Sequence, residues 1–118
     1  MKSIFGLNEN IAAALAYLFG PFSGIIVLVL ERENKFVRFH ALQSTLWFLF
    51  LMITSWVLGV FTSIPIIGLI LGLVINPVLW LGGILTFVSW AFLMFKAYSG
   101  ATFKIPVIGD VVWTQVNK

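Results

Sequence analysis

The residues best suited to chemistry lie in one short polar stretch, Glu31–Ser44, which reads ERENKFVRFHALQS. It holds five of the chain's eleven charged residues and its only histidine. A carboxylate at Glu31 or Glu33 together with His40 could transfer protons, because carboxylates and imidazole are common general acids and bases. The sequence contains no cysteine and no nucleophile-elbow, phosphate-loop or metal-binding motif. We therefore expect no enzyme activity, no cofactor and no metal site.

The same stretch separates two uncharged apolar runs, which favours a structural role at a membrane edge. For His40 this role is a hydrogen bond at the interface, and the alternative is proton sensing, because histidine titrates near neutral pH. We predict that Glu31 or Glu33 pairs with Arg38 or Lys96 and clamps the inner ends of the membrane spans. The residues of this predicted clamp or docking surface are Glu31, Glu33, Asn34, Lys35, Arg38, His40 and Gln43.

Composition places the chain among integral membrane proteins. Of its 118 residues, 61% are hydrophobic and only 9% are charged, whereas soluble domains carry about 25% charged residues. The apolar runs are long enough to cross a bilayer, which takes about 20 residues in a helix. We expect a single all-helical membrane domain.

Three transmembrane helices are predicted, at residues 10–30, 41–61 and 77–98, followed by an interfacial cytoplasmic tail at 99–118. Within the second of them, Gln43 needs a hydrogen-bond partner from outside its own helix. Residues 64–76 are predicted to form a short interfacial or re-entrant helix, and the alternative is a short fourth span that completes a four-helix membrane bundle. Proline removes a backbone donor and asparagine can cap a new helix. The predicted helix breaks are Pro21, Pro65, Asn76 and Pro77.

Lysine and arginine set the expected orientation, because cytoplasmic segments near span ends carry an excess of them. An odd number of crossings places six basic residues on one side against one on the other, and an even number splits them three against four. We therefore predict three spans in a prokaryotic plasma membrane, with the N-terminus outside and the C-terminus in the cytoplasm. The basic residues would contact anionic lipid headgroups rather than nucleic acid.

Small residues recur at intervals that favour close helix packing. Four of them follow one face of the first predicted helix, and such faces let two backbones approach in lipid. We expect the chain to form homo-oligomers or to pack with partner membrane proteins. The predicted packing positions are Ala12, Ala16, Gly20, Gly24, Gly68 and Gly72.

A five-residue pattern occurs twice, as IPIIG at Ile64–Gly68 and as IPVIG at Ile105–Gly109. Such a short echo is weak support for a duplication. The simpler interpretation is that each Ile-Pro turn places an apolar ridge on the membrane surface.

Three segments carry a resemblance to a known group: GLNENIAAALAYLFG, GIIVLVLERENKFVRFHALQS and KAYSGATFKIPVIGD. They resemble small uncharacterised prokaryotic membrane proteins that are grouped with the import-channel component of the chloroplast inner-envelope translocon. The most specific motifs are E-x-E-N-K-F-V-R-F-H-A-x-Q-S and K-A-Y-x-G-x-x-x-K-I-P-x-I-G-D. The resemblance implies a role in polypeptide passage and brings no catalytic residue, and the chloroplast relatives have four spans.

Together these features predict a non-enzymatic small membrane protein that acts through helix packing with itself or with partners. Assisting the insertion or translocation of polypeptides would be one such role. The alternative is an oligomeric channel or carrier for ions or small solutes, with the segment Ile64–Pro77 lining the path.

Overall fold

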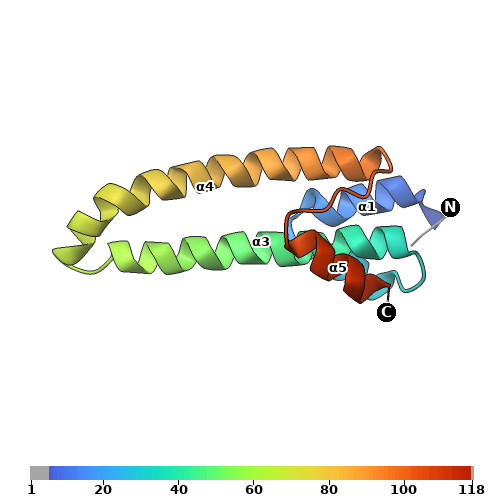
Figure 1. Cartoon of the computed structure of the whole chain (residues 1–118), viewed down its shortest axis with the longest axis horizontal. Coiled ribbons are helices and arrows are strands. Elements are labelled where there is room, and N and C mark those ends of the chain that lie inside the picture. Colours follow the sequence, from blue (N-terminus) through green and yellow to red (C-terminus); the bar gives the residue numbers. More distant parts are fainter. Residues whose placement is uncertain (1–5, 118) are drawn as a thin grey trace.

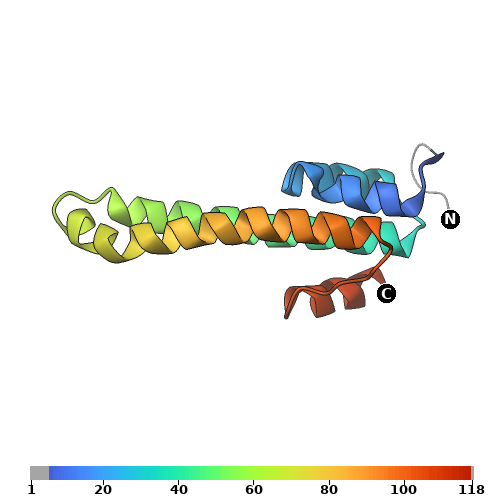
Figure 2. The same cartoon turned by 90° about the horizontal axis from the view of Figure 1, so that it is seen from above.

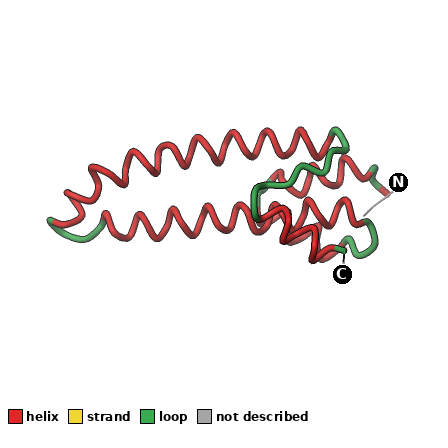
Figure 3. Tube along the Cα trace, in the orientation of Figure 1, coloured by secondary structure: helices red, strands yellow, loops and turns green. Residues whose placement is uncertain are grey.

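The computed structural model describes residues 6–117, and its regular elements are α-helices (Figures 1 and 3). The molecule is elongated, with extents of 56 × 24 × 23 Å. The predicted all-helical architecture is confirmed. In chain order the helices are α1 (Glu9–Leu18), α2 (Pro21–Leu30), α3 (Lys35–Thr62), α4 (Ile67–Tyr98) and α5 (Ile108–Val116).

Two antiparallel helices, α3 and α4, extend along the length of the molecule (Figure 1). Their 28 and 32 residues are apolar enough to cross a membrane, and they extend about 42 and 48 Å at the usual helical rise. Both exceed a hydrocarbon core of about 30 Å. Asn34 begins α3 as predicted, because its side chain accepts the N–H of Val37 at 3.1 Å.

The first apolar run differs from the prediction, because it forms a hairpin of two short helices instead of one kinked span. Each of α1 and α2 has 10 residues, which is about 15 Å, or half the hydrocarbon thickness. Gly20 reverses the chain at φ 62° and ψ −133°, a conformation open to glycine because it has no Cβ. Pro21 then starts α2, where its missing N–H costs nothing.

The hairpin returns the chain to the side from which it started. Asn34 donates to the Glu9 carboxylate at 3.0 Å, so the start of α1 and the polar stretch lie at the same end of the molecule. Within residues 6–117, two helices are long and apolar enough to span a membrane, and the prediction of three spans is not confirmed. The N-terminus, predicted to lie opposite the polar stretch, is outside the described residues, whereas the start of α1 lies on the side of the polar stretch.

The predicted helix break at Asn76 and Pro77 is wrong, because both lie inside the continuous helix α4. Asn76 folds back over the preceding turn instead of capping a new helix, and its amide nitrogen lies 3.3 Å from where a Cβ on Gly72 would stand. The axis of α4 bends in its yellow part in Figure 1, as expected where proline removes one hydrogen bond. Of the predicted short separate helix, residues 67–76 are therefore the start of α4, and residues 64–66 belong to the turn before it.

The break at Pro65 is confirmed, and the turn around it is a γ-turn. Ile66 has φ 67° and ψ −63°, and the N–H of Ile67 bonds the carbonyl of Pro65 at 2.7 Å. This turn is rare and strained for a β-branched residue. The turn requires a glycine at position 68, because a Cβ there would collide with the carbonyl of Thr62.

The second copy of the pattern has the same conformation at the start of α5. Val107 has φ 69° and ψ −57°, and the N–H of Ile108 bonds the carbonyl of Pro106 at 2.8 Å. A Cβ on Gly109 would collide with the side chain and backbone of Lys104. The repeated pattern is thus a local motif that reverses the chain and starts a helix.

The molecule has a wide half and a narrow half. In the wide half, the α1–α2 hairpin lies on one side of the α3–α4 pair, and α5 lies on the other (Figure 2). The narrow half contains only the far parts of α3 and α4 and the turn between them. The core fills the wide half and consists mainly of Ala12, Ala13, Ala16, Tyr17, Val27, Val37, Ala41, Phe48, Leu93, Ala97 and Ile105.

Candidate functional site

A buried polar cluster joins α1, α3 and the segment after α4. Tyr17, His40 and Gln43 are completely buried. The Tyr17 hydroxyl lies 2.7 Å from Nδ1 of His40, and Nε2 of His40 lies 2.9 Å from the carbonyl of Ala101. A carbonyl only accepts, so Nε2 carries the hydrogen and Nδ1 accepts from the tyrosine. The geometry therefore makes His40 a neutral hydrogen-bonding residue.

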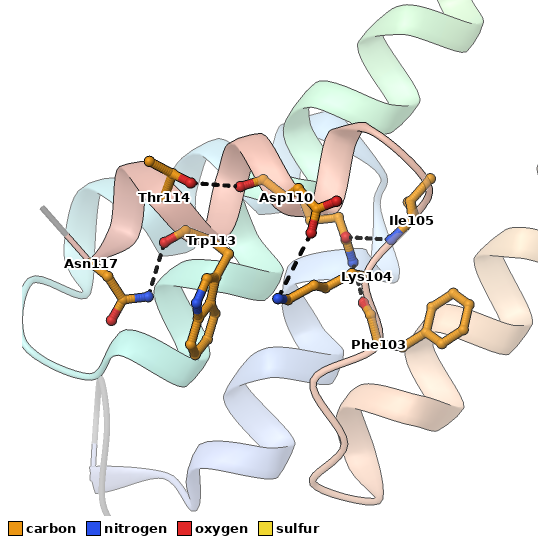
Figure 4. A network of polar contacts seen from close by, with 8 residues as sticks. Phe103, Lys104, Ile105, Asp110, Trp113, Thr114 and Asn117 are labelled. Carbon is orange, nitrogen blue, oxygen red and sulfur yellow. Dashed lines mark hydrogen bonds and ion pairs between the residues drawn. The ribbon is translucent and has the colours of Figure 1, made fainter.

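Gln43 holds the segment between α4 and α5 through its main chain. Its amide nitrogen donates to the Tyr17 hydroxyl and to the carbonyl of Phe103, both at 2.9 Å. Its amide oxygen accepts the N–H of Ile105 at 2.9 Å. Figure 4 shows these bonds at Phe103 and Ile105. Gln43 and His40 thus bind an extended stretch of chain by backbone atoms, independently of its side chains.

The tip of the hairpin is attached to the long helices by hydrogen bonds to its carbonyl groups. Ser44 on α3 donates to the carbonyls of Ala16 and Gly20 at 2.8 and 3.0 Å. Trp90 on α4 donates to the carbonyl of Leu18 at 3.1 Å. The last carbonyls of a helix have no partner within it, so the bonds to Ala16 and Leu18 help to complete α1, and all three bonds hold the tip against the long helices.

The predicted ion pair of Arg38 is replaced by bonds to the main chain. Nη1 of Arg38 donates to the carbonyls of Leu28 and Glu31 at 3.1 and 2.6 Å. These carbonyls end α2, where unpaired acceptors and the negative end of the helix dipole favour a cation. Within residues 6–117, Glu31 and Glu33 form no ion pair with Arg38 or Lys96. Arg38 on α3 therefore binds the end of α2 through carbonyl groups, in place of the predicted carboxylate.

The ion pair that the described residues do contain joins Lys104 to Asp110, with 3.8 Å between nitrogen and oxygen (Figure 4). The Lys104 ammonium also lies 5.0 Å from the centre of the Trp113 ring. Both charged side chains are well exposed, so the pair contributes little to stability. It holds the beginning of α5 close to the segment before it.

The predicted packing face of the first run is used inside the chain. Ala12 and Ala16 are completely buried, and they pack with apolar residues of α2 and α3. Gly24 allows the closest approach, because a Cβ there would lie 2.6 Å from the Thr45 hydroxyl oxygen. A Cβ on Gly20 would meet the Phe48 ring at 3.8 Å. This face joins the hairpin to α3.

Beyond the hairpin tip, an apolar groove of about 760 Å³ lies between α3 and α4. It adjoins a second hollow of about 500 Å³ on α4, which shares Gly83 and Phe87 with it. Gly59, Gly82 and Gly83 have no atom within 4 Å of where a Cβ would stand. The groove is lined by Leu18, Phe19, Gly20, Pro21, Phe22, Phe48, Leu51, Met52, Ser55, Trp56, Gly83, Thr86, Phe87 and Trp90.

Sequence reasoning identified part of this arrangement. Gln43 is the residue predicted to need an outside partner, whereas Tyr17 was missed. The available signal was a tyrosine in an otherwise apolar run, since a buried tyrosine hydroxyl usually finds a partner. Lys35 and Glu33 are exposed. Among residues 6–117, no three His, Cys, Asp or Glu side chains gather to hold a metal ion.

Comparisons with known proteins agree on one family. The model of the magnetosome magnetite crystal formation protein family matches residues 8–112. A UPF0132 membrane protein of Archaeoglobus fulgidus is 42% identical over 112 residues, which cover 94% of this chain and 98% of the relative. A UPF0132 membrane protein of Methanocaldococcus jannaschii is 43% identical over 110 residues, which cover 93% and 90%.

No solved structure matches the chain. The archaeal relatives are named as membrane proteins, which confirms the similarity to small prokaryotic membrane proteins. The more distant similarity to the chloroplast import component stays a prediction.

Proposed function

This chain belongs to the magnetosome magnetite crystal formation protein family, and we propose that it is a non-enzymatic membrane protein that acts by helix packing. In this proposal, the long helices pack against a second copy of the chain or against partner membrane proteins. The family description concerns magnetite crystal formation, while the archaeal relatives are named only as membrane proteins. The names of the archaeal relatives therefore support a place in the membrane.

The observation that carries the proposal is the set of glycines on α3 and α4 that have no neighbour inside the chain. A glycine within a helix costs about 0.5–1 kcal/mol relative to alanine. Gly24 has a packing reason, because Thr45 occupies the space of a Cβ, but Gly59, Gly82 and Gly83 face open space. Small residues at such positions allow close approach of another helix in lipid.

The apolar groove supports the same proposal, because Gly83 lies in its wall. The α1–α2 hairpin ends at about half the membrane depth, so it leaves the far parts of α3 and α4 uncovered on that side (Figure 2). A partner helix along α4 would fill the groove and bring its backbone close to Gly83.

The distribution of charge supports an orientation with the wide half in the cytoplasm. All five lysines and arginines between residues 6 and 117 lie in or beside the wide half (Figure 1). The turn at the far end, residues 63–66, carries no charge. In a prokaryotic plasma membrane, the excess of basic residues favours the cytoplasmic side. The start of α1 would then be cytoplasmic together with the polar stretch.

Assistance to the insertion or translocation of polypeptides is a more specific form of this proposal. Its structural support is the binding of residues 101–105 by His40 and Gln43 through main-chain atoms. Such bonds are available from any extended polypeptide. The resemblance to the chloroplast import component supports the same role.

Cysteine cross-linking in native membranes tests the packing proposal, since the chain has no cysteine of its own. Ile84→Cys places a thiol in the hollow beside Gly83, and we expect disulfide-linked dimers after mild oxidation. Val78→Cys is the matched control, because it is exposed and lies about 120° around α4 from Ile84. Adding Gly83→Leu to Ile84→Cys should abolish the cross-link.

Equal cross-linking at both positions would show random collision and refute the packing face. Cross-links to other membrane proteins would identify partners other than a second copy. Ion flux through purified protein in liposomes, lost on Gly83→Leu, would instead favour the channel or carrier.

A further inference from the structure

A separate hollow, with polar and basic walls, lies in the wide half of the molecule. It has a volume of about 640 Å³ and is formed by the end of α2, the start of α3 and the last turn of α5. Figure 1 shows the end of α5 beside the loop that joins α2 to α3. Its charged residues are Arg32, Lys35, Arg38 and Glu33. Three positive charges against one negative charge leave a net charge of +2.

Arg38 is oriented in this hollow before any ligand arrives. Its Nη1 is held by the carbonyls of Leu28 and Glu31, and the side chain is half-buried. Its other N–H donors make no hydrogen bond within residues 6–117, and Arg38 lines the hollow. A guanidinium held in this way presents planar, paired donors that match the oxygens of a phosphate.

Arg32 and Lys35 add positive charge that no neighbour neutralises. Both side chains are exposed, and neither forms an ion pair in the described part of the chain. Lys35 is also the first residue of α3, and a helix N-terminus carries a positive partial charge. Glu33 is the single carboxylate in the wall. The hollow is therefore electrostatically suited to an anion.

The wall beside the charges is apolar, and this favours a lipid over a soluble anion as the ligand. Val29 lines the hollow, and it belongs to an exposed apolar face of α2 with Ile25 and Ile26. This face continues along the hairpin towards the narrow half. A ligand that satisfied both surfaces would carry an anionic headgroup and a hydrocarbon chain.

We propose that this hollow binds the phosphate of one anionic phospholipid, with an acyl chain along the exposed face of α2. The site is distinct from the groove beside Gly83 and does not depend on assembly. In this proposal, the anionic headgroup binds at one defined position instead of being attracted diffusely to the surface. The position is defined because Arg38 is fixed and the flanking charges lie beside it.

Native mass spectrometry of the full chain in detergent, with added phosphatidylglycerol or phosphatidylcholine, tests the site. We expect one phosphatidylglycerol to be retained per chain in preference to phosphatidylcholine. Arg32→Gln with Lys35→Gln should weaken retention about thirtyfold, since each basic residue near a headgroup contributes a factor of about five. Neither side chain makes a hydrogen bond within residues 6–117, so the fold should be retained.

The matched control is Lys96→Gln with Lys104→Gln, which removes the same charge from the wide half outside the hollow. We expect less than a twofold change in phosphatidylglycerol retention. Equal losses in the two double variants would show a diffuse attraction and overturn the defined site. Equal retention of the two lipids would overturn the preference for an anion. Displacement by millimolar inorganic phosphate would overturn a lipid as the ligand.

Discussion

Replacing Gln43 by leucine should release the segment that joins α4 to α5. The substitution keeps a similar volume but removes all three hydrogen bonds of the side chain. The N–H of Ile105 is then left buried without an acceptor, and the carbonyl of Phe103 loses a donor in a half-buried place. The Tyr17 hydroxyl keeps its bond to His40.

The expected loss follows from these groups. An unsatisfied buried donor or acceptor costs about 1–3 kcal/mol. The Ile105 N–H bears the full cost, while the Phe103 carbonyl can recover a bond from water and bears less. The free energy of unfolding should fall by about 2–4 kcal/mol, which lowers the melting temperature by roughly 8–16 °C for a chain of this size.

Two measurements on purified protein in detergent test this prediction. The first is thermal unfolding, with Gln115→Leu as the matched control, because Gln115 is exposed on α5 and its side chain makes no hydrogen bond within residues 6–117. We expect that control to change stability by about 0.5 kcal/mol or less. The second is limited trypsin digestion after the exposed Lys104, which should become faster as the segment loosens. A Gln43→Leu variant as stable and as protected as Gln115→Leu would refute the reasoning.

Two further substitution sets test the clamp and the glycine turns by thermal unfolding in the same detergent. Arg38→Gln should lower the free energy of unfolding by about 1.5–3 kcal/mol, because the charged bonds to the α2 carbonyls are lost, and Glu31→Gln should change it by less than about 0.5 kcal/mol. An equal loss of stability in the two variants would support the pairing of Arg38 with a carboxylate. Gly68→Ala and Gly109→Ala should each cost about 1–3 kcal/mol by overpacking. Gly82→Ala, whose Cβ meets open space, should be neutral or stabilising, and equal losses at all three glycines would contradict the turn geometry.

Several features of this protein are already decided by local sequence. The scarcity of charge and the length of the apolar runs indicate a membrane protein, because too few polar residues remain to cover a surface in water. Asn34 caps the start of a helix, because its side chain can accept an N–H of the first turn. Pro65 ends α3 because proline cannot continue the ladder of hydrogen bonds. Gln43 required an outside partner because a primary amide within an apolar helix cannot satisfy itself.

The hairpin could not be predicted in this way. Gly20 and Pro21 are compatible with both a kink and a reversal, and no residue nearby distinguishes them. The reversal is stabilised by contacts that are distant in sequence: Ser44 binds the carbonyls at the tip, and Asn34 binds Glu9. This choice also places the start of α1 on the side of the polar stretch.

The partners of the charged residues were also decided only by tertiary structure. Charge complementarity predicts a carboxylate for Arg38, but the fold places the unpaired end of α2 within its reach. His40 and Tyr17 meet because the hairpin brings α1 against α3. Residue types limit which bonds a side chain can make, and the fold determines which of the possible partners lies at bonding distance.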